Sequence, residues 1–348
     1  MEPTLGTALA LLGGVVVVLI ALQGWWSARR AAPRRPAPAS APDPAQRVEP
    51  GFDEADGAAP LTAPAPELRT SALRRPARID ALIDAIVPLT LEAPVSGELV
   101  LSHLPPSRRA GTKVLLIEGL DTEAGQWEAP AAGRRYGELQ AAVQLASRSG
   151  ALNEIEYSEF VQKIQAFADG VGAVPDFPDM LDVVGRAREL DTFAGPLDAV
   201  LTVTLRANNV AWSVGYVQQC AQRLGFVAGA VPGRLVLPAA EEGAPPLLVL
   251  SFDPQAALAD EPQAAAVREC TLSLDVPQSD EKAEPFPAWH DAARTLSDDM
   301  DATLVDDQGQ PVTLHAFAAI GTELQKIYRA LALRDLAAGS TAARRLFS

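Results

Sequence analysis

The sequence predicts an α+β protein with an N-terminal transmembrane helix, a proline-rich linker and two two-layer blocks. Each block is expected to be an antiparallel sheet covered by helices on one face. Three observations lead to this prediction. Residues 4–26 contain no charged side chain. Ten of the 29 prolines lie in residues 31–78. After that, strand-like alternation followed by helical periodicity occurs twice, which is typical of two-layer α+β folds.

The N-terminal apolar segment is predicted to be a single-pass membrane anchor over residues 1–30. A helix needs about 20 apolar residues to cross the hydrocarbon core, and residues 4–26 provide this length. Two tryptophans end the segment at the expected headgroup level, and arginines follow at positions 29 and 30, which places the rest of the chain in the cytoplasm. The alternative, a cleaved signal peptide, would carry a basic start and a short apolar core, whereas this chain begins with Met-Glu.

Residues 31–78 are predicted to form a disordered linker. Proline, alanine and acidic residues dominate stretches such as PRRPAPASAPDPAQ, which cannot bury enough apolar surface to offset the entropy of ordering. At ~3.1 Å per residue in the polyproline conformation, such a linker would reach on the order of 100 Å from the bilayer. The linker would therefore set how far the folded blocks extend.

The folded part of the chain is acidic. Nine basic and seven acidic residues precede position 79, which leaves 20 basic and 37 acidic residues in the remaining 270. A net charge of this sign disfavours binding to nucleic acid or anionic lipid through the folded blocks. We therefore expect no nucleic-acid partner.

The sequence offers little catalytic chemistry. Cys220 and Cys270 each lie in an apolar pattern, which favours burial over a disulfide or a nucleophile. The three histidines are far apart and lack partners at metal-ligand spacing. No phosphate loop, nucleophile elbow, HExxH motif or dinucleotide fingerprint is present. The acidic pairs at 298–299 and 306–307 fit a helix end and a turn better than a metal site. We expect a protein that is not an enzyme, without catalytic residues, cofactor, metal or small-molecule substrate.

Block one is assigned to residues 79–195. Its helix from Asn153 has the clearest pattern, because apolar side chains recur at helical spacing and Glu156 stands three residues after the cap. The other expected elements are an apolar run at 79–91, a helix at 96–104, strands at 113–120 and 137–147, and a helix at 178–194 that opens with Pro178.

Block two is assigned to residues 196–338 and repeats this order, which predicts a diverged duplication. Its first strand, at 198–207, alternates apolar with mixed side chains and so has two distinct faces. The expected elements after it are a helix at 211–224, strands at 233–239, 246–252 and 269–277, a helix at 285–301, a strand at 302–307 and a final helix capped by Thr313. The tail, residues 339–348, is expected to fray, which leaves the apolar pair Leu346 and Phe347 without an explanation.

Several segments together resemble the ZipA family, which tethers the tubulin-like division protein FtsZ to the bacterial inner membrane. The anchor ends in GWWSARR (24–30), and a proline-rich linker follows it. The matching segments of block two are AVLTVTL (199–205), the helix end AQRLGF (221–226), TLSLDVP (271–277) and DDMDATLVDDQGQPVT (298–313). The resemblance covers the anchor and residues 196–338, whereas block one shares only the order of elements.

The resemblance implies a cleft on the sheet of block two, which in that family binds the C-terminal tail of FtsZ through apolar contacts. Carried over by position, the partner-binding residues are Val200, Thr202, Val231, Phe252, Thr271 and Ser273. This chain departs from the family because the outward face of 269–277 is polar, where the family has bulky apolar side chains. The alternative is that Val200 and Phe252 belong to the core and that the hydroxyl residues form an ordinary solvated face.

Two functions are therefore expected as alternatives. The first is an inner-membrane adaptor at the division site, whose cytoplasmic blocks bind the FtsZ tail and tether the division ring. The second is an envelope scaffold whose two blocks pack together, cover the cleft and bind another division or envelope protein. The role of block one does not follow from the sequence.

Overall fold

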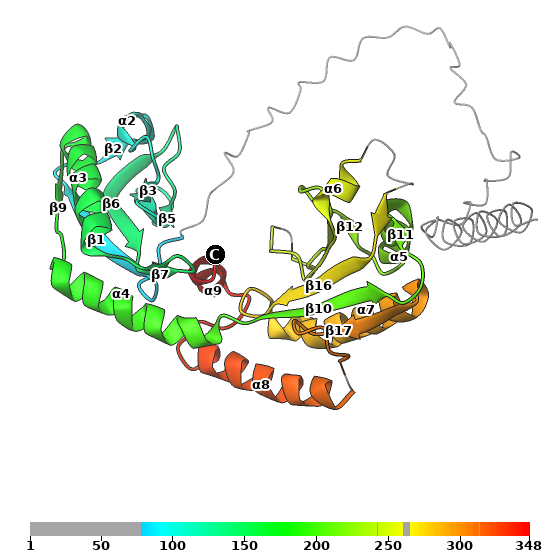
Figure 1. Ribbon diagram of the computed structural model, residues 1–348. Coiled ribbons are helices and arrows are strands. Elements are labelled where there is room, and N and C mark those ends of the chain that lie inside the picture. The colour runs from blue at the N-terminus through cyan, green and yellow to red at the C-terminus, as the bar shows by residue number, and fades with distance from the viewer. Residues whose placement is uncertain (1–77, 242, 260–264, 313) are drawn as a thin grey trace, which may run out of the picture.

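The computed structural model describes residues 78–241, 243–259, 265–312 and 314–348 (Figure 1). The predicted anchor, all of the predicted linker except Arg78, and the predicted cap Thr313 lie outside these residues. Within the described ranges, no helix is both long and apolar enough to span a membrane.

Block one is an antiparallel sheet with two long helices. Its helices are α2 (Gly97–His103), α3 (Glu154–Val171) and α4 (Met180–Ala194). Its strands are β1 (Asp84–Leu91), β2 (Val95–Ser96), β3 (Arg109–Ala110), β4 (Lys113–Asp121), β5 (Trp127–Glu128), β6 (Arg135–Gln144), β7 (Ala146–Ser147), β8 (Gly150–Ala151) and β9 (Ala173–Pro175). The expected helix at 96–104 and the expected strands are therefore present, and a turn at 81–83 delays the start of the first strand.

Block two follows after a 3₁₀ turn, η2 (Gly195–Leu197). Its helices are α5 (Val214–Arg223), α6 (Pro254–Ala257), the 3₁₀ turn η3 (Glu281–Ala283), α7 (Pro285–Met300) and α8 (Leu314–Ala332). Its strands are β10 (Val200–Ala207), β11 (Trp212–Ser213), β12 (Val227–Ala228), β13 (Arg234–Leu237), β14 (Leu248–Ser251), β15 (Ala266–Val267), β16 (Glu269–Asp275) and β17 (Ala302–Val305). The helix expected from residue 211 starts at Val214, because Trp212 and Ser213 pair with β15 and Ser213 caps the helix.

The two blocks have the same topology. The blocks share a five-strand order, β3-β4-β6-β1-β9 in block one and β13-β14-β16-β10-β17 in block two, and each pairing along these paths is antiparallel. In block two, β12 extends the sheet beyond β13. In both blocks the chain runs from the strand beside one edge of the sheet (β1 or β10) through a short helix and the next three strands of the shared order to a long helix, an edge strand and a second long helix. This shared arrangement is what a duplication predicts.

In block two, a long helix covers one face of the sheet. Alternate side chains of β10 and β16, including Val203, Leu205 and Leu272, are buried against α7. The indole Nε1 of Trp289 on α7 donates to the backbone oxygen of Leu272 at 3.3 Å, which ties the helix to a central strand. The intervening side chains of both strands are exposed or half-buried, and point away from α7. The predicted two faces of the segment 198–207 are therefore confirmed.

One predicted helix start is confirmed and another is wrong. Asn153 caps α3, and Glu156 returns a hydrogen bond to its backbone, which completes the expected capping box. The helix expected from Pro178 begins at Met180 instead. The carboxylate of Asp179 accepts hydrogen bonds from the first turn of α4, so Asp179 is the cap and Pro178 precedes it.

The C-terminal tail does not fray, contrary to the prediction for residues 339–348. It forms a short helix, α9 (Thr341–Leu346), and the side chains of Leu346 and Phe347 are each 1% exposed. Figure 1 shows α9 between the two blocks. The physical reason is that the apolar end of the chain gains more free energy by burial than it loses in conformational entropy.

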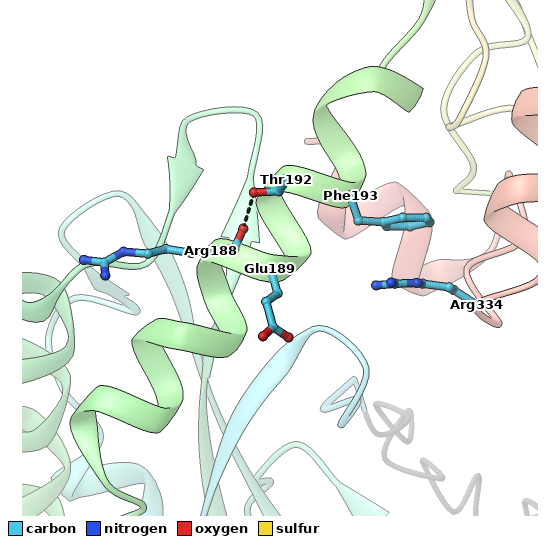
Figure 2. Close-up of a pocket in the computed structure, with 5 residues that line it drawn as sticks. All are labelled: Arg188, Glu189, Thr192, Phe193 and Arg334. Atoms are coloured by element: carbon cyan, nitrogen blue, oxygen red, sulfur yellow. Dashed lines mark hydrogen bonds between the residues drawn. The ribbon is translucent and has the colours of Figure 1, made fainter.

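Two further contacts join the blocks. Arg148, in the turn between β7 and β8, pairs with Asp198 at 2.6 Å and with Asp275 at 2.8 Å in block two. The guanidinium carbon of Arg334, after α8, lies 4.3 Å from the ring centroid of Phe193 on α4. Figure 2 shows the side chains of Arg334 and Phe193 facing each other. Both line an open hollow of about 490 Å³. The blocks therefore touch at two places, near the ends of strands at Arg148 and between helical segments at Arg334.

Candidate peptide-binding face

The candidate site is the sheet face of block two that points away from α7, which we call the open face. It consists of Val200, Thr202 and Thr204 on β10, Thr271 and Ser273 on β16, and Val249 and Ser251 on β14. Val200 is 50% exposed and Thr202 is exposed, while the other side chains are half-buried. Val200 therefore lies on the accessible face and not in the core.

The strand register arranges this face in two rows. The rows are Thr202–Ser273–Val249 and Thr204–Thr271–Ser251. Val200 continues the face at one end, where it lies opposite Asp275. Side chains directly opposite each other in an antiparallel pair have Cβ atoms about 4.5–5.5 Å apart, so the rows form a continuous surface.

The hydroxyl groups of the open face already have partners. Ser273 Oγ donates to the backbone oxygen of Val249 at 3.3 Å, and Ser251 Oγ donates to a backbone oxygen of β16 at the same distance. Thr202 Oγ1 donates to Asp307 Oδ1 at 3.1 Å. Covering a hydroxyl that keeps its hydrogen bond costs less free energy than covering one that loses its only partner, water. The face is therefore less hydrophilic than its composition indicates.

Charged side chains border the open face at both ends. Asp198 and Asp275 stand at one end with Arg148, and the pair of Arg206 and Glu269, 2.8 Å apart, stands at the other. Hydrogen bonds to Asp198 and Asp275 hold the pKa of the Arg148 guanidinium above its usual range. The border thus has three carboxylates and two guanidinium groups, which favours a ligand with positive charge.

Two of the predicted partner-binding residues lie elsewhere. Val231 is 54% exposed in the turn between β12 and β13. These two strands lie at the edge of the sheet opposite to β17, the edge strand that pairs with β10. Phe252 follows β14 and is only 7% exposed, within the core. Successive side chains of a strand point to opposite faces of the sheet. Because Ser251 points to the open face, Phe252 points toward the helix layer. The structure therefore removes Phe252 from the set of residues that a partner could touch.

Sequence reasoning missed the charged border of this face. Arg148 belongs to block one, in a Ser-Arg-Ser turn that carries no signal for a role in block two. Asp198 and Asp275 were within reach of prediction, because both stand at the same end of two strands that pair. The predicted burial of Cys220 and Cys270 is confirmed, and neither forms a disulfide.

Among the residues that the structure describes, no group of three or more histidine, cysteine, aspartate or glutamate side chains could hold a metal ion. No protein-family model matches this chain, and a search of curated proteins finds no significant relative.

Proposed function

We propose that this protein is a membrane-tethered adaptor of the ZipA type, whose open face binds the C-terminal tail of FtsZ. The predicted anchor would hold it in the bacterial inner membrane with both blocks in the cytoplasm, and the linker would set their reach. Many copies along an FtsZ filament would bind with raised avidity, because each bound copy raises the effective concentration for the next. The protein would thereby tether the division ring to the membrane.

The position of Val200 is the observation that supports this proposal most. Val200 is half exposed at the end of the sheet face that points away from α7, in the block that carries the sequence resemblance. A few apolar anchors usually carry most of the binding energy of a peptide. The hydroxyl rows beside Val200 are flatter and more polar than an apolar cleft, so we expect weak binding by each copy and reliance on avidity.

The scaffold alternative requires that the packed blocks cover this face. The blocks do touch, but their contacts through α9, Arg148 and Arg334 leave both Val200 and Thr202 exposed. An exposed face remains available to a peptide. We therefore favour the adaptor.

A titration of a synthetic FtsZ tail peptide into the full chain in mild detergent tests the proposal. We expect saturable binding in the micromolar range. Val200→Asp should weaken it by about tenfold or more, because a charge would replace an apolar contact. No binding at high micromolar peptide would overturn the proposal.

Leu181→Asp is the matched control for this titration. Leu181 is 74% exposed in the first turn of α4, where a carboxylate is favoured by the helix dipole. This variant should bind the peptide like the parent chain. If it lost as much affinity as Val200→Asp, the loss would not report on the open face.

A further inference from the structure

The open face of block two has a counterpart in block one. Both α3 and α7 end at a residue in the left-handed conformation, and the next residue begins an edge strand. In block one this residue, Ala173, pairs with Leu91 of β1. In block two it is Ala302, which pairs with Ala207 of β10. Leu91 therefore corresponds to Ala207.

This correspondence aligns the two faces residue by residue. Counting back along β1 and β10 matches Asp84 to Val200. The cross-strand register then matches Gln144, the partner of Asp84, to Asp275, the partner of Val200. Asp84 and Gln144 thus occupy the end of the face in block one where Val200 lies in block two.

In block one, α9 fills this end of the face. Arg345 donates to both carboxylate oxygens of Asp84, at 2.6 and 2.8 Å, and its backbone oxygen accepts from Gln144 Nε2 at 2.8 Å. Leu346 and Phe347 are each 1% exposed, and Asp84 and Gln144 are equally buried. The C-terminus of the chain therefore covers the counterpart of the open face.

We propose that block one carries a second peptide-binding face, which the chain's own C-terminal segment closes as a cis ligand. The partner that this face fits is a peptide segment of another protein that forms one or two helical turns, with an arginine followed directly by two apolar residues. The carboxylate of Asp84 selects arginine, because a guanidinium can donate two parallel hydrogen bonds to it. This inference stands whatever block two binds.

The contacts of α9 resemble those of a bound peptide. The helix α9 has only six residues, and so short a helix is unstable by itself in water. Residues 333–335 before it are exposed, and Asp335 and Gly339 adopt left-handed backbone conformations that turn the chain. Contacts with both blocks hold α9 in place, because Gln144 and Gln278 also donate to the backbone oxygens of Arg345 and Phe347. A competing segment that forms the same short helix with the same side chains can make these contacts and replace it.

The test detaches the segment only after the chain has folded. A protease site is inserted in the full chain between Arg334 and Asp335, both of which are exposed. The probe is a fluorescent peptide of residues 335–348. After cleavage, we expect the chain to exchange its own segment for the probe. The uncleaved chain should exclude the probe, because an intramolecular ligand has a much higher effective concentration.

Two neighbouring arginines provide the matched control. A probe with Arg345→Gln should bind about 30-fold more weakly or worse, because it leaves Asp84 buried without its partner. A probe with Arg344→Gln should lose less than about fivefold. The reason is that Arg344 pairs with Glu241, whose side chain is 70% exposed.

Three outcomes would overturn the proposal. The cleaved chain could remain folded, by circular dichroism, and yet fail to take up the probe. It could lose its fold on cleavage, in which case α9 is part of the core and not a replaceable ligand. The uncleaved chain could bind the probe as well as the cleaved chain does, which would place the binding site elsewhere.

Discussion

Arg345 forms a buried bidentate ion pair with Asp84, 261 residues earlier in the chain. The two side chains are 8% and 0% exposed. Burial raises the pKa of Asp84, and the hydrogen bonds from Arg345 oppose that rise. The same guanidinium donates to the backbone oxygen of Arg78. This one side chain therefore joins the two ends of the described chain on one face of block one.

Breaking this pair should destabilise the protein strongly. Arg345→Ala leaves the carboxylate of Asp84 buried without its partner, a change that costs about 3–5 kcal/mol of unfolding free energy. Arg344→Ala removes a pair with an exposed carboxylate and should cost less than about 1 kcal/mol. Urea unfolding followed by circular dichroism measures both values. Equal effects of the two substitutions would contradict the buried pair.

Glu156 should make the stability of block one depend on pH. Burial raises its pKa, but hydrogen bonds from the backbone N–H and the hydroxyl of Thr112 outweigh this, so the pKa lies below the ordinary 4.5. A depressed pKa in the folded state adds stability above that ordinary value, and this stability is lost as pH falls through the folded-state pKa. Glu156→Gln should therefore cost about 1 kcal/mol at neutral pH and little in acid.

Urea unfolding at neutral and acidic pH measures this difference. Glu154→Gln is the control, because Glu154 lies in the same first turn of α3 but its side chain is 46% exposed. It should change the unfolding free energy by less than about 0.5 kcal/mol at either pH. A cost for Glu156→Gln that does not shrink in acid would rule out the depressed pKa.

Arg148 should restrict the relative orientation of the two blocks. Its side chain is 30% exposed, and it bridges Asp198 and Asp275, which are each 28% exposed. In Arg148→Ala we expect a broader distribution of distances between spin labels on α4 and α7, because a charge-assisted hydrogen-bond network is lost. Arg188→Ala removes a pair with Glu154 inside block one and should leave the distribution unchanged. An unchanged distribution in both variants would show that Arg148 does not restrict the blocks.

Cys220 and Cys270 should be unreactive in the folded protein. Their side chains are 0% and 1% exposed, and burial raises the pKa of Cys270. The thiolate is the reactive form of cysteine, and neither thiol has the exposure that a reagent needs, although Arg223 Nη2 donates to Cys220 Sγ at 3.7 Å. An aromatic disulfide reagent at mildly alkaline pH should therefore react with both thiols in urea and with neither in the native state. Rapid labelling of the native protein would contradict their burial.

Local patterns in the sequence predicted the long elements well. The stripe of α3 and its Asn153 cap were recognisable because one helix face is buried and one side chain closes the first turn. The two faces of β10 were recognisable for the same reason. The start of α4 was missed because Asp179, directly after Pro178, is the stronger cap.

The candidate site was predicted only in part. Thr202 and Ser273 lie opposite each other on the open face, as the alternation of their strands requires. The inward side of Phe252 follows from the same alternation, because Phe252 comes directly after Ser251 of the open face, so its place among the partner-binding residues was wrong. Arg148 reaches the face from another block, and no local pattern encodes such a contact.

The sequence by itself determined the order of elements, the two-faced strands and the burial of both cysteines. Each of these follows from the spacing of apolar residues over a few positions, which is a local property. Only the tertiary structure decided that the C-terminal segment covers block one and that Asp84 pairs with Arg345. The physical reason is that such a contact joins distant residues, and its free energy depends on the whole surface that folding assembles around it.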